Sequence, residues 1–84
     1  MKPSPTNIIL IDDHEMVRRG LRALLHLEPD MTIVEEAGTV ADGVAAVERL
    51  APQMVLLDVK LPDASLTEAC RRLLAVAPKL RILV

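Results

Sequence analysis

The sequence predicts an α/β domain in which a parallel sheet is covered by helices on both faces. Short apolar runs alternate with segments whose apolar residues recur at helical spacing, and prolines or glycines separate them. This pattern gives the order βαβαβαβ, and strands that alternate with helices form a parallel sheet through right-handed crossovers. The 84 residues include no aromatic side chain, so the core must be built from leucine, valine, isoleucine, alanine and methionine. A chain of this length forms one small domain.

The first half of the chain contains two expected strands and one expected helix. The β-branched run Ile8–Ile11 is typical of a strand that is buried on both faces. The helical period begins at Glu15 and is expected to end at Pro29. Gly20 lowers the stability of this helix, which predicts close packing there. The run 32–37 is more polar than the first strand and predicts an edge strand. The apolar face of the helix comprises Val17, Leu21, Leu24 and Leu25.

The second half contains two further helices and two strands. Thr39 and Ser65 each precede a helix, and Asp42 and Glu68 follow three residues later as capping-box partners. The run 54–57 predicts a buried strand between the helices, and the run 80–84 begins a fourth strand. The expected buried faces are Val40, Val44, Val47 and Ala51 in the first of these helices, and Leu66, Ala69, Cys70, Leu73 and Leu74 in the second.

Several classes of protein are excluded by composition. The net charge of −2 provides no electrostatic footprint for nucleic acid, and no apolar run approaches the roughly 20 residues that span a bilayer. Residues 1–6 are polar and broken by proline, so they predict a flexible N-terminus without a signal core, ahead of a domain over 7–84. One cysteine, Cys70, excludes an internal disulfide and fits a reducing compartment. A cytoplasmic protein without membrane contact is expected.

Three carboxylates are expected to meet at one edge of the sheet. Asp12 and Asp13 end the first strand and Asp58 ends the third, and open α/β sheets bind ligands beyond the carboxyl ends of their strands. If these strands are neighbours, the oxygen ligands suit Mg²⁺ beside a phosphate. Structural roles remain open as alternatives: Asp13 as a helix N-cap, and Asp58 as a turn residue before Leu61.

The remaining polar residues near this edge are expected to lie at the surface. His14 follows the acids, but a single imidazole at a helix start is typical of a surface group, although histidine can ligate metals. The ammonium group of Lys60 is expected to be solvated. The first helix also carries a basic strip that is expected to be solvated, formed by Arg18, Arg19 and Arg22.

Two ordered motifs resemble those of a known family. Ile8–His14 followed by Val17–Leu21 resembles the opening of bacterial response-regulator receiver domains, particularly the NarL/FixJ branch with a C-terminal LuxR-type helix-turn-helix. Val55–Pro62 is similar to the phosphoacceptor strand and loop of that family. The resemblance runs from Asn7 to the end of the chain. It implies a flavodoxin-like (CheY-like) doubly wound sheet, which is incomplete here because its last units are missing.

The resemblance implies a phosphoacceptor function. Asp58 would take a phosphoryl group from a sensor histidine kinase and form an acyl phosphate. Asp13 would bind Mg²⁺ directly, with Asp12 beside it, and the backbone carbonyl of Lys60 would supply a further oxygen. Enzymatic activity would be limited to self-catalysed phosphoryl transfer and autodephosphorylation. DNA binding, and with it the regulation of transcription, would be carried out by a C-terminal output domain outside these residues.

Two alternative functions remain open. The chain stops before the switch Ser/Thr and the fifth-strand lysine of the family, which favours a phosphorylation-independent module of the same fold that forms a homodimer through its open strand edge. A Mg²⁺-dependent phosphatase with Asp58 as nucleophile is the other alternative. Such enzymes usually carry a second acid two residues later, where this chain has Lys60.

Overall fold

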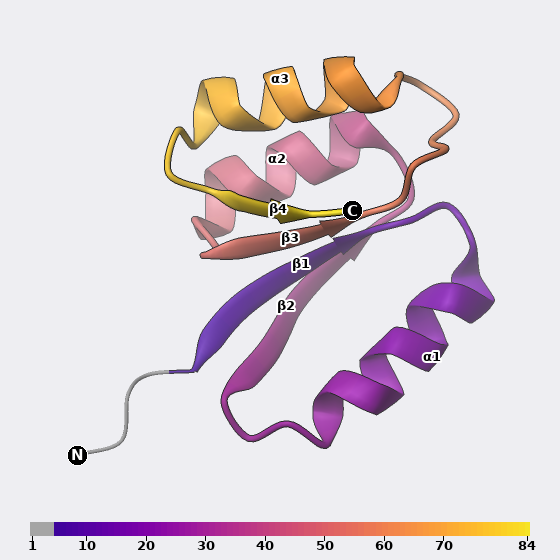
Figure 1. Ribbon diagram of the computed structural model, residues 1–84, viewed down its shortest axis with the longest axis vertical. Coiled ribbons are helices and arrows are strands. Elements are labelled where there is room, and N and C mark those ends of the chain that lie inside the picture. Colours follow the sequence, from indigo (N-terminus) through magenta and orange to yellow (C-terminus); the bar gives the residue numbers. More distant parts are fainter. Residues whose placement is uncertain (1–4) are drawn as a thin grey trace.

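The computed structural model describes residues 5–84, which form a four-stranded parallel sheet with helices on both faces (Figure 1). The strands lie in the order β2-β1-β3-β4. The elements are β1 (Thr6–Ile11), α1 (Glu15–His26), β2 (Met31–Ala37), α2 (Val40–Leu50), β3 (Met54–Leu57), α3 (Leu66–Val76) and β4 (Arg81–Leu83). The predicted α/β class, the βαβαβαβ order and the edge position of β2 are confirmed.

The start of the chain differs slightly from the predicted boundary. Of the expected flexible segment 1–6, residues 1–4 lie outside the described residues. Thr6 is already the first residue of β1 and pairs with Met31 of β2. The sheet therefore begins one residue before the predicted domain start.

The core lies mainly between the sheet and the α2–α3 layer. Figure 1 shows α2 and α3 side by side on one face of the sheet and α1 on the other. The central strand β1 is buried on both faces, because Ile8–Ile11 are at most 1% exposed. Val47 of α2 and Leu73 of α3 pack into the same cluster as Ile9 and Ile11. Apolar burial of this kind is the dominant stabilising contribution to such a domain.

Helix α1 is covered less than its apolar periodicity predicts. It packs against β2, and none of its residues is fully buried. Leu21 and Leu25 are half-buried, whereas Val17 and Leu24 are 45% and 65% exposed. The predicted face is therefore only half correct. Among residues 5–84, no second helix lies beside α1 on this face of the sheet to cover the other half.

The helix ends confirm both capping predictions. Thr39 Oγ1 accepts a hydrogen bond from the Asp42 N–H at 3.1 Å, and Ser65 Oγ accepts one from the Glu68 N–H at 3.2 Å. Ala51, however, does not belong to the buried face of α2. It is exposed and caps the helix in the left-handed conformation, with φ of 47°.

Close packing involves a different glycine from the one that the sequence suggested. A Cβ atom at Gly20 would meet no atom within 4 Å, so the expected close packing there is wrong. Gly43 of α2 lies directly over Ile11 of β1, and a Cβ atom at that position would overlap the isoleucine side chain. The absence of a side chain at Gly43 therefore lets α2 approach the sheet.

None of the helices formed by residues 5–84 is long and apolar enough to cross a membrane.

Candidate functional site

The candidate site lies at the carboxyl ends of two neighbouring strands. Ile11 of β1 pairs with Leu57 of β3, and the Asp58 N–H continues the ladder by donating to the Ile11 carbonyl at 2.9 Å. Asp12 and Asp58 therefore leave the sheet side by side. This is the position at which parallel α/β sheets bind ligands, because the polar loops that follow adjacent strands converge there.

Four side chains meet at this point. Ligand atoms of Asp12, Asp13, His14 and Asp58 all lie within 4.8 Å of one another. The side chain of Asp12 is 12% exposed and that of Asp58 is 22% exposed, whereas that of Asp13 is 37% exposed. The three acids that the sequence singled out are thus brought together, and one further residue joins them.

That further residue is His14, which the sequence had assigned to the surface. Its Nδ1 atom lies 2.9 Å from Asp12 Oδ1, 3.0 Å from Asp13 Oδ1 and 3.6 Å from Asp58 Oδ2. Its side chain is 62% exposed, so one edge of the ring faces water while Nδ1 faces the acids. The hydrogen bond with Asp12, followed by the charge of Asp13, raises the pKa of His14.

The turn after β1 explains this orientation. Asp12 Oδ1 accepts a hydrogen bond from the His14 backbone N–H at 2.8 Å, two residues along the chain. His14 is also the N-cap residue of α1, and its side chain makes no capping hydrogen bond. The alternative of Asp13 as N-cap is therefore wrong. Adjacency to the acids was the only sequence signal for His14, because the direction of its ring depends on this turn.

The donor atoms fit a small divalent cation. Asp58 Oδ2 is buried and accepts no hydrogen bond from any residue in the range 5–84. A buried carboxylate oxygen without a partner is costly, and a cation would satisfy it. Clustered carboxylate oxygens are the ligands that Mg²⁺ prefers. Lys60 follows in the exposed loop after β3, and the role of its backbone carbonyl stays a prediction.

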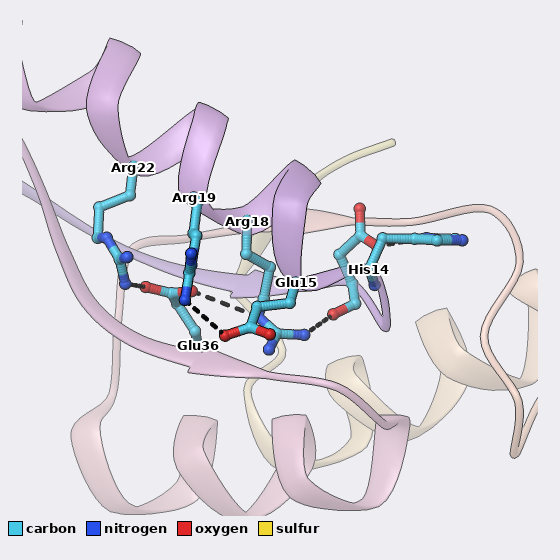
Figure 2. Close-up of polar contacts among 7 residues, drawn as sticks. His14, Glu15, Arg18, Arg19, Arg22 and Glu36 are labelled. Atoms are coloured by element: carbon cyan, nitrogen blue, oxygen red, sulfur yellow. Dashed lines mark hydrogen bonds and ion pairs between the residues drawn. The ribbon is translucent and has the colours of Figure 1, made fainter.

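Arg18 of α1 holds the loop that carries the acids. Its Nη1 atom donates to the backbone carbonyl of Asp12, and its Nε atom lies 3.3 Å from Glu36 Oε1 on β2. Figure 2 shows Arg18 and Arg22 reaching from α1 toward Glu36, where Arg22 Nη1 lies 2.5 Å from Oε2. The prediction of a solvated basic strip is wrong for Arg18, whose side chain is only 21% exposed.

The loop after β3 is tied to the start of α2. Asp63 Oδ1 accepts a hydrogen bond from the Val40 N–H at 2.8 Å, and Oδ2 accepts one from the Ala41 N–H at 3.0 Å. These bonds lower the pKa of Asp63. Asp63 therefore caps α2 from the loop after β3, although this helix begins 23 residues earlier in the chain. Nothing local in the sequence indicates that contact.

Comparison with known proteins agrees with this geometry. Residues 8–84 match the family model of the response regulator receiver domain. The chain is 48% identical over 77 residues to the DNA-binding transcriptional activator DevR/DosR of Mycobacterium tuberculosis, covering 92% of this chain and 36% of that protein. It is 39% identical over 69 residues to the nitrate/nitrite response regulator protein NarL of Escherichia coli, covering 82% of this chain and 32% of that protein.

A solved structure supports the same assignment. The chain superposes on a LuxR-family two-component response regulator from Aurantimonas sp. SI85-9A1 with a TM-score of 0.87 and 32% identity. This match covers 94% of the present chain and 56% of the solved one. The chain spans about a third of the length of the two curated relatives. Both the matched residues and the fold lead to one conclusion: this chain belongs to the receiver-domain family of two-component response regulators.

Proposed function

We propose that Asp58 is the phosphoacceptor of this receiver domain and that a sensor histidine kinase is the donor. The observation that carries the proposal is the position of its carboxylate. Asp58 directly follows β3 and lies beside Asp12, and its Oδ2 atom is buried without a hydrogen bond from any described residue. A carboxylate oxygen that no protein donor occupies is available as a nucleophile.

The transfer is a substitution at phosphorus. A carboxylate oxygen of Asp58 attacks the phosphorus of a phosphohistidine, and a P–O bond forms as the P–N bond breaks. The leaving imidazole nitrogen keeps the electron pair of the broken bond, and the ring takes up a proton from solvent. The product is an acyl phosphate, whose hydrolysis by water would return Asp58 to its original state. Such self-catalysed steps are the extent of the proposed enzymatic activity.

Asp12, Asp13 and Asp58, with the backbone carbonyl of Lys60, would hold Mg²⁺ at this site. When bound, the ion would neutralise the charge on the phosphoryl oxygens and on the carboxylates. The carboxylates of Asp12 and Asp13 lie beside that of Asp58, so they would hold the positive charge next to the nucleophile. Arg18 acts indirectly, because its contact with the Asp12 carbonyl holds the loop in place.

The biological role proposed for the whole protein is control of transcription. The curated relatives are described as a DNA-binding transcriptional activator and a nitrate/nitrite response regulator. By that likeness, phosphorylation of Asp58 would control a DNA-binding domain outside these residues, in the cytoplasm. The 84 residues themselves have a net charge of −2, which provides no electrostatic attraction for the phosphate backbone of DNA.

A phosphorylation assay tests the proposal directly. The full protein is incubated with Mg²⁺ and a small phosphodonor, and intact mass is measured for the native chain, Asp58→Asn and the matched loop control Asp63→Asn. We expect a gain of one phosphoryl group in the native chain and in Asp63→Asn, and none in Asp58→Asn or with EDTA. A gain that survives in Asp58→Asn would contradict the proposal, and turnover of many donor molecules per chain would favour the phosphatase alternative.

A second candidate function is self-association without phosphorylation. Among the described strands, β4 lies at one end of the sheet and pairs only with β3, and Leu83 on it is 58% exposed. Such an edge can pair with a second copy of the chain. Sedimentation of the unphosphorylated protein at several concentrations tests this role. A dimer that Asp58→Asn leaves unchanged would support it, and a monomer at every concentration would exclude it.

A further inference from the structure

We propose that a cavity at the amino ends of the strands binds a small organic carboxylate. Lys79 and Arg81 hold the acidic group of this ligand, and its apolar body lies against Pro52 and Leu80. The cavity has a volume of about 640 Å³, which is within the range of sites for small organic ligands. Because the strands are parallel, it lies at the opposite edge of the sheet from Asp58 and is separate from the proposed phosphoacceptor site.

Two similar turns form the walls of the cavity. Residues 51–53 join α2 to β3, residues 77–80 join α3 to β4, and each turn begins with Ala-Pro. Figure 1 shows both helices ending at the edge where β3 and β4 begin. The Gln53 N–H donates to the Asn7 carbonyl at 3.1 Å, and the Arg81 N–H donates to the Gln53 carbonyl at 3.1 Å. These bonds fix both turns to the sheet, so the cavity is formed before a ligand enters.

The charge of the lining favours an anion. Lys79 and Arg81 line the cavity together with no acidic residue. Both are exposed, and neither forms an ion pair with any residue in the range 5–84. The carboxyl ends of α2 and α3 oppose an anion here, but each helix end contributes only about half a negative charge. The two full positive charges therefore outweigh the two helix ends.

Gln53 supplies a further hydrogen-bond donor to the same cavity. Its Oε1 atom accepts the Asn7 N–H at 2.7 Å, which directs the oxygen of the amide to the backbone of β1. The Nε2 group donates to no acceptor among the described residues, so it is available to a ligand. An ammonium, a guanidinium and an amide N–H₂ group all donate, and a carboxylate has two oxygens that only accept.

The rest of the lining is suited to the apolar part of such a ligand. Pro52 and Leu80 are buried, and Val76 at the end of α3 is 38% exposed. Covering this surface with a short hydrocarbon chain removes apolar area from water. A carboxylate with a chain of several carbons therefore fits the cavity better than a small inorganic anion does.

Titration of the full protein with hexanoate, followed through its backbone amide NMR signals, tests the site. We expect saturable shifts at residues 51–53 and 77–81. Acetate has the same acidic group without the chain and should bind at least about fivefold more weakly. Hexylammonium has the same chain with the opposite charge and should produce no saturable shift at these residues.

Variants of the lining separate the charge from the apolar contact. Lys79→Gln and Arg81→Gln should each weaken hexanoate binding about two- to fivefold, as expected for exposed ion pairs, and the double variant about tenfold. Val76→Ala should weaken the binding of hexanoate more than that of acetate. Arg71→Gln is the matched control, because Arg71 is an exposed cation of α3 outside the cavity, and this variant should bind as the native protein does.

Three results would overturn the inference. The first is the absence of saturable shifts with hexanoate. The second is equal binding of hexanoate and hexylammonium, because apolar contact alone would then explain the affinity. The third is native affinity in the Lys79→Gln, Arg81→Gln double variant. The amide spectrum of each variant without ligand shows whether the fold is retained, so a loss of affinity can be assigned to the cavity.

Discussion

Asp63, which follows β3, caps α2 by accepting a hydrogen bond from the Val40 N–H at 2.8 Å. The second oxygen of the same carboxylate accepts a bond from the Ala41 N–H at 3.0 Å. These two bonds hold the loop that follows Asp58 against the start of α2. Thr39, the residue directly before α2, caps the same helix by accepting from the Asp42 N–H. Two side chains therefore satisfy separate N–H groups at the start of this helix.

Replacing Asp63 with alanine should destabilise the domain, because the N–H groups of Val40 and Ala41 would lose their partner. Asp63→Asn should have a midpoint between those of the other two, because asparagine offers one acceptor oxygen where both carboxylate oxygens of Asp63 accept. Denaturant midpoints of the three proteins provide the measurement. Equal midpoints for Asp63→Ala and the native protein would show that the contact contributes nothing.

The same carboxylate predicts a dependence of stability on pH. The bonds from Val40 and Ala41 lower the pKa of Asp63 below its usual value of 3.8. The unfolded chain therefore takes up the proton first, so the contribution is complete above pH 3.8 and is lost as pH falls through the lower folded value. The difference in unfolding free energy between the native protein and Asp63→Asn should shrink over that interval. A difference that stays constant with pH would contradict this explanation.

The two helical glycines should respond oppositely to alanine. Gly43→Ala introduces a Cβ atom that overlaps the fully buried Ile11, and such overpacking costs about 1–3 kcal/mol. The gain in helix propensity, up to about 1 kcal/mol, does not offset that cost. Gly20→Ala meets no atom within 4 Å and should stabilise the domain by about 0.5–1 kcal/mol. Chemical denaturation of both variants tests the pair, and destabilisation by both would show that Gly20 is also packed closely.

Arg18 should matter for metal binding, although it does not touch the proposed ion. Arg18→Ala removes the donor to the Asp12 carbonyl and the partner of Glu36, which should lower the unfolding free energy by about 1.5–3 kcal/mol. The affinity for Mg²⁺ should fall several-fold, because the loop of acids loses its support. Arg19→Ala is the matched control, since among residues 5–84 Arg19 pairs only with Glu15 at the surface, and it should change stability by less than about 0.5 kcal/mol. Titration calorimetry and denaturation distinguish the two, and an equal response would exclude a positioning role for Arg18.

The order of elements could be predicted because it depends on local patterns. The uninterrupted apolar run Ile8–Ile11 indicated a strand covered on both faces, and the structure buries all four residues. Thr39 and Ser65 were recognised as caps because a cap and its partner lie within one helical turn. The apolar face of α1 was only half correct, because its burial depends on which elements cover that side of the sheet.

The candidate site could be predicted only in part. The acids Asp12, Asp13 and Asp58 were identified because parallel strands place their carboxyl ends at one edge. The contributions of His14, Arg18 and Asp63 were not identified. Each depends on where a turn or a neighbouring helix directs a side chain, and residue type and spacing do not contain that information.

The sequence by itself therefore determined the α/β class, the helix caps and the three carboxylates, because these follow from local periodicity and from the ends of strands. Only the tertiary structure decided that Gly43 rather than Gly20 permits a close approach, and that His14 Nδ1 faces all three acids. The physical reason is that packing distances and side-chain directions arise from contacts between segments that are far apart in the chain or joined by a turn. The carboxylates were visible in the sequence, whereas the nitrogen among them was revealed by the fold.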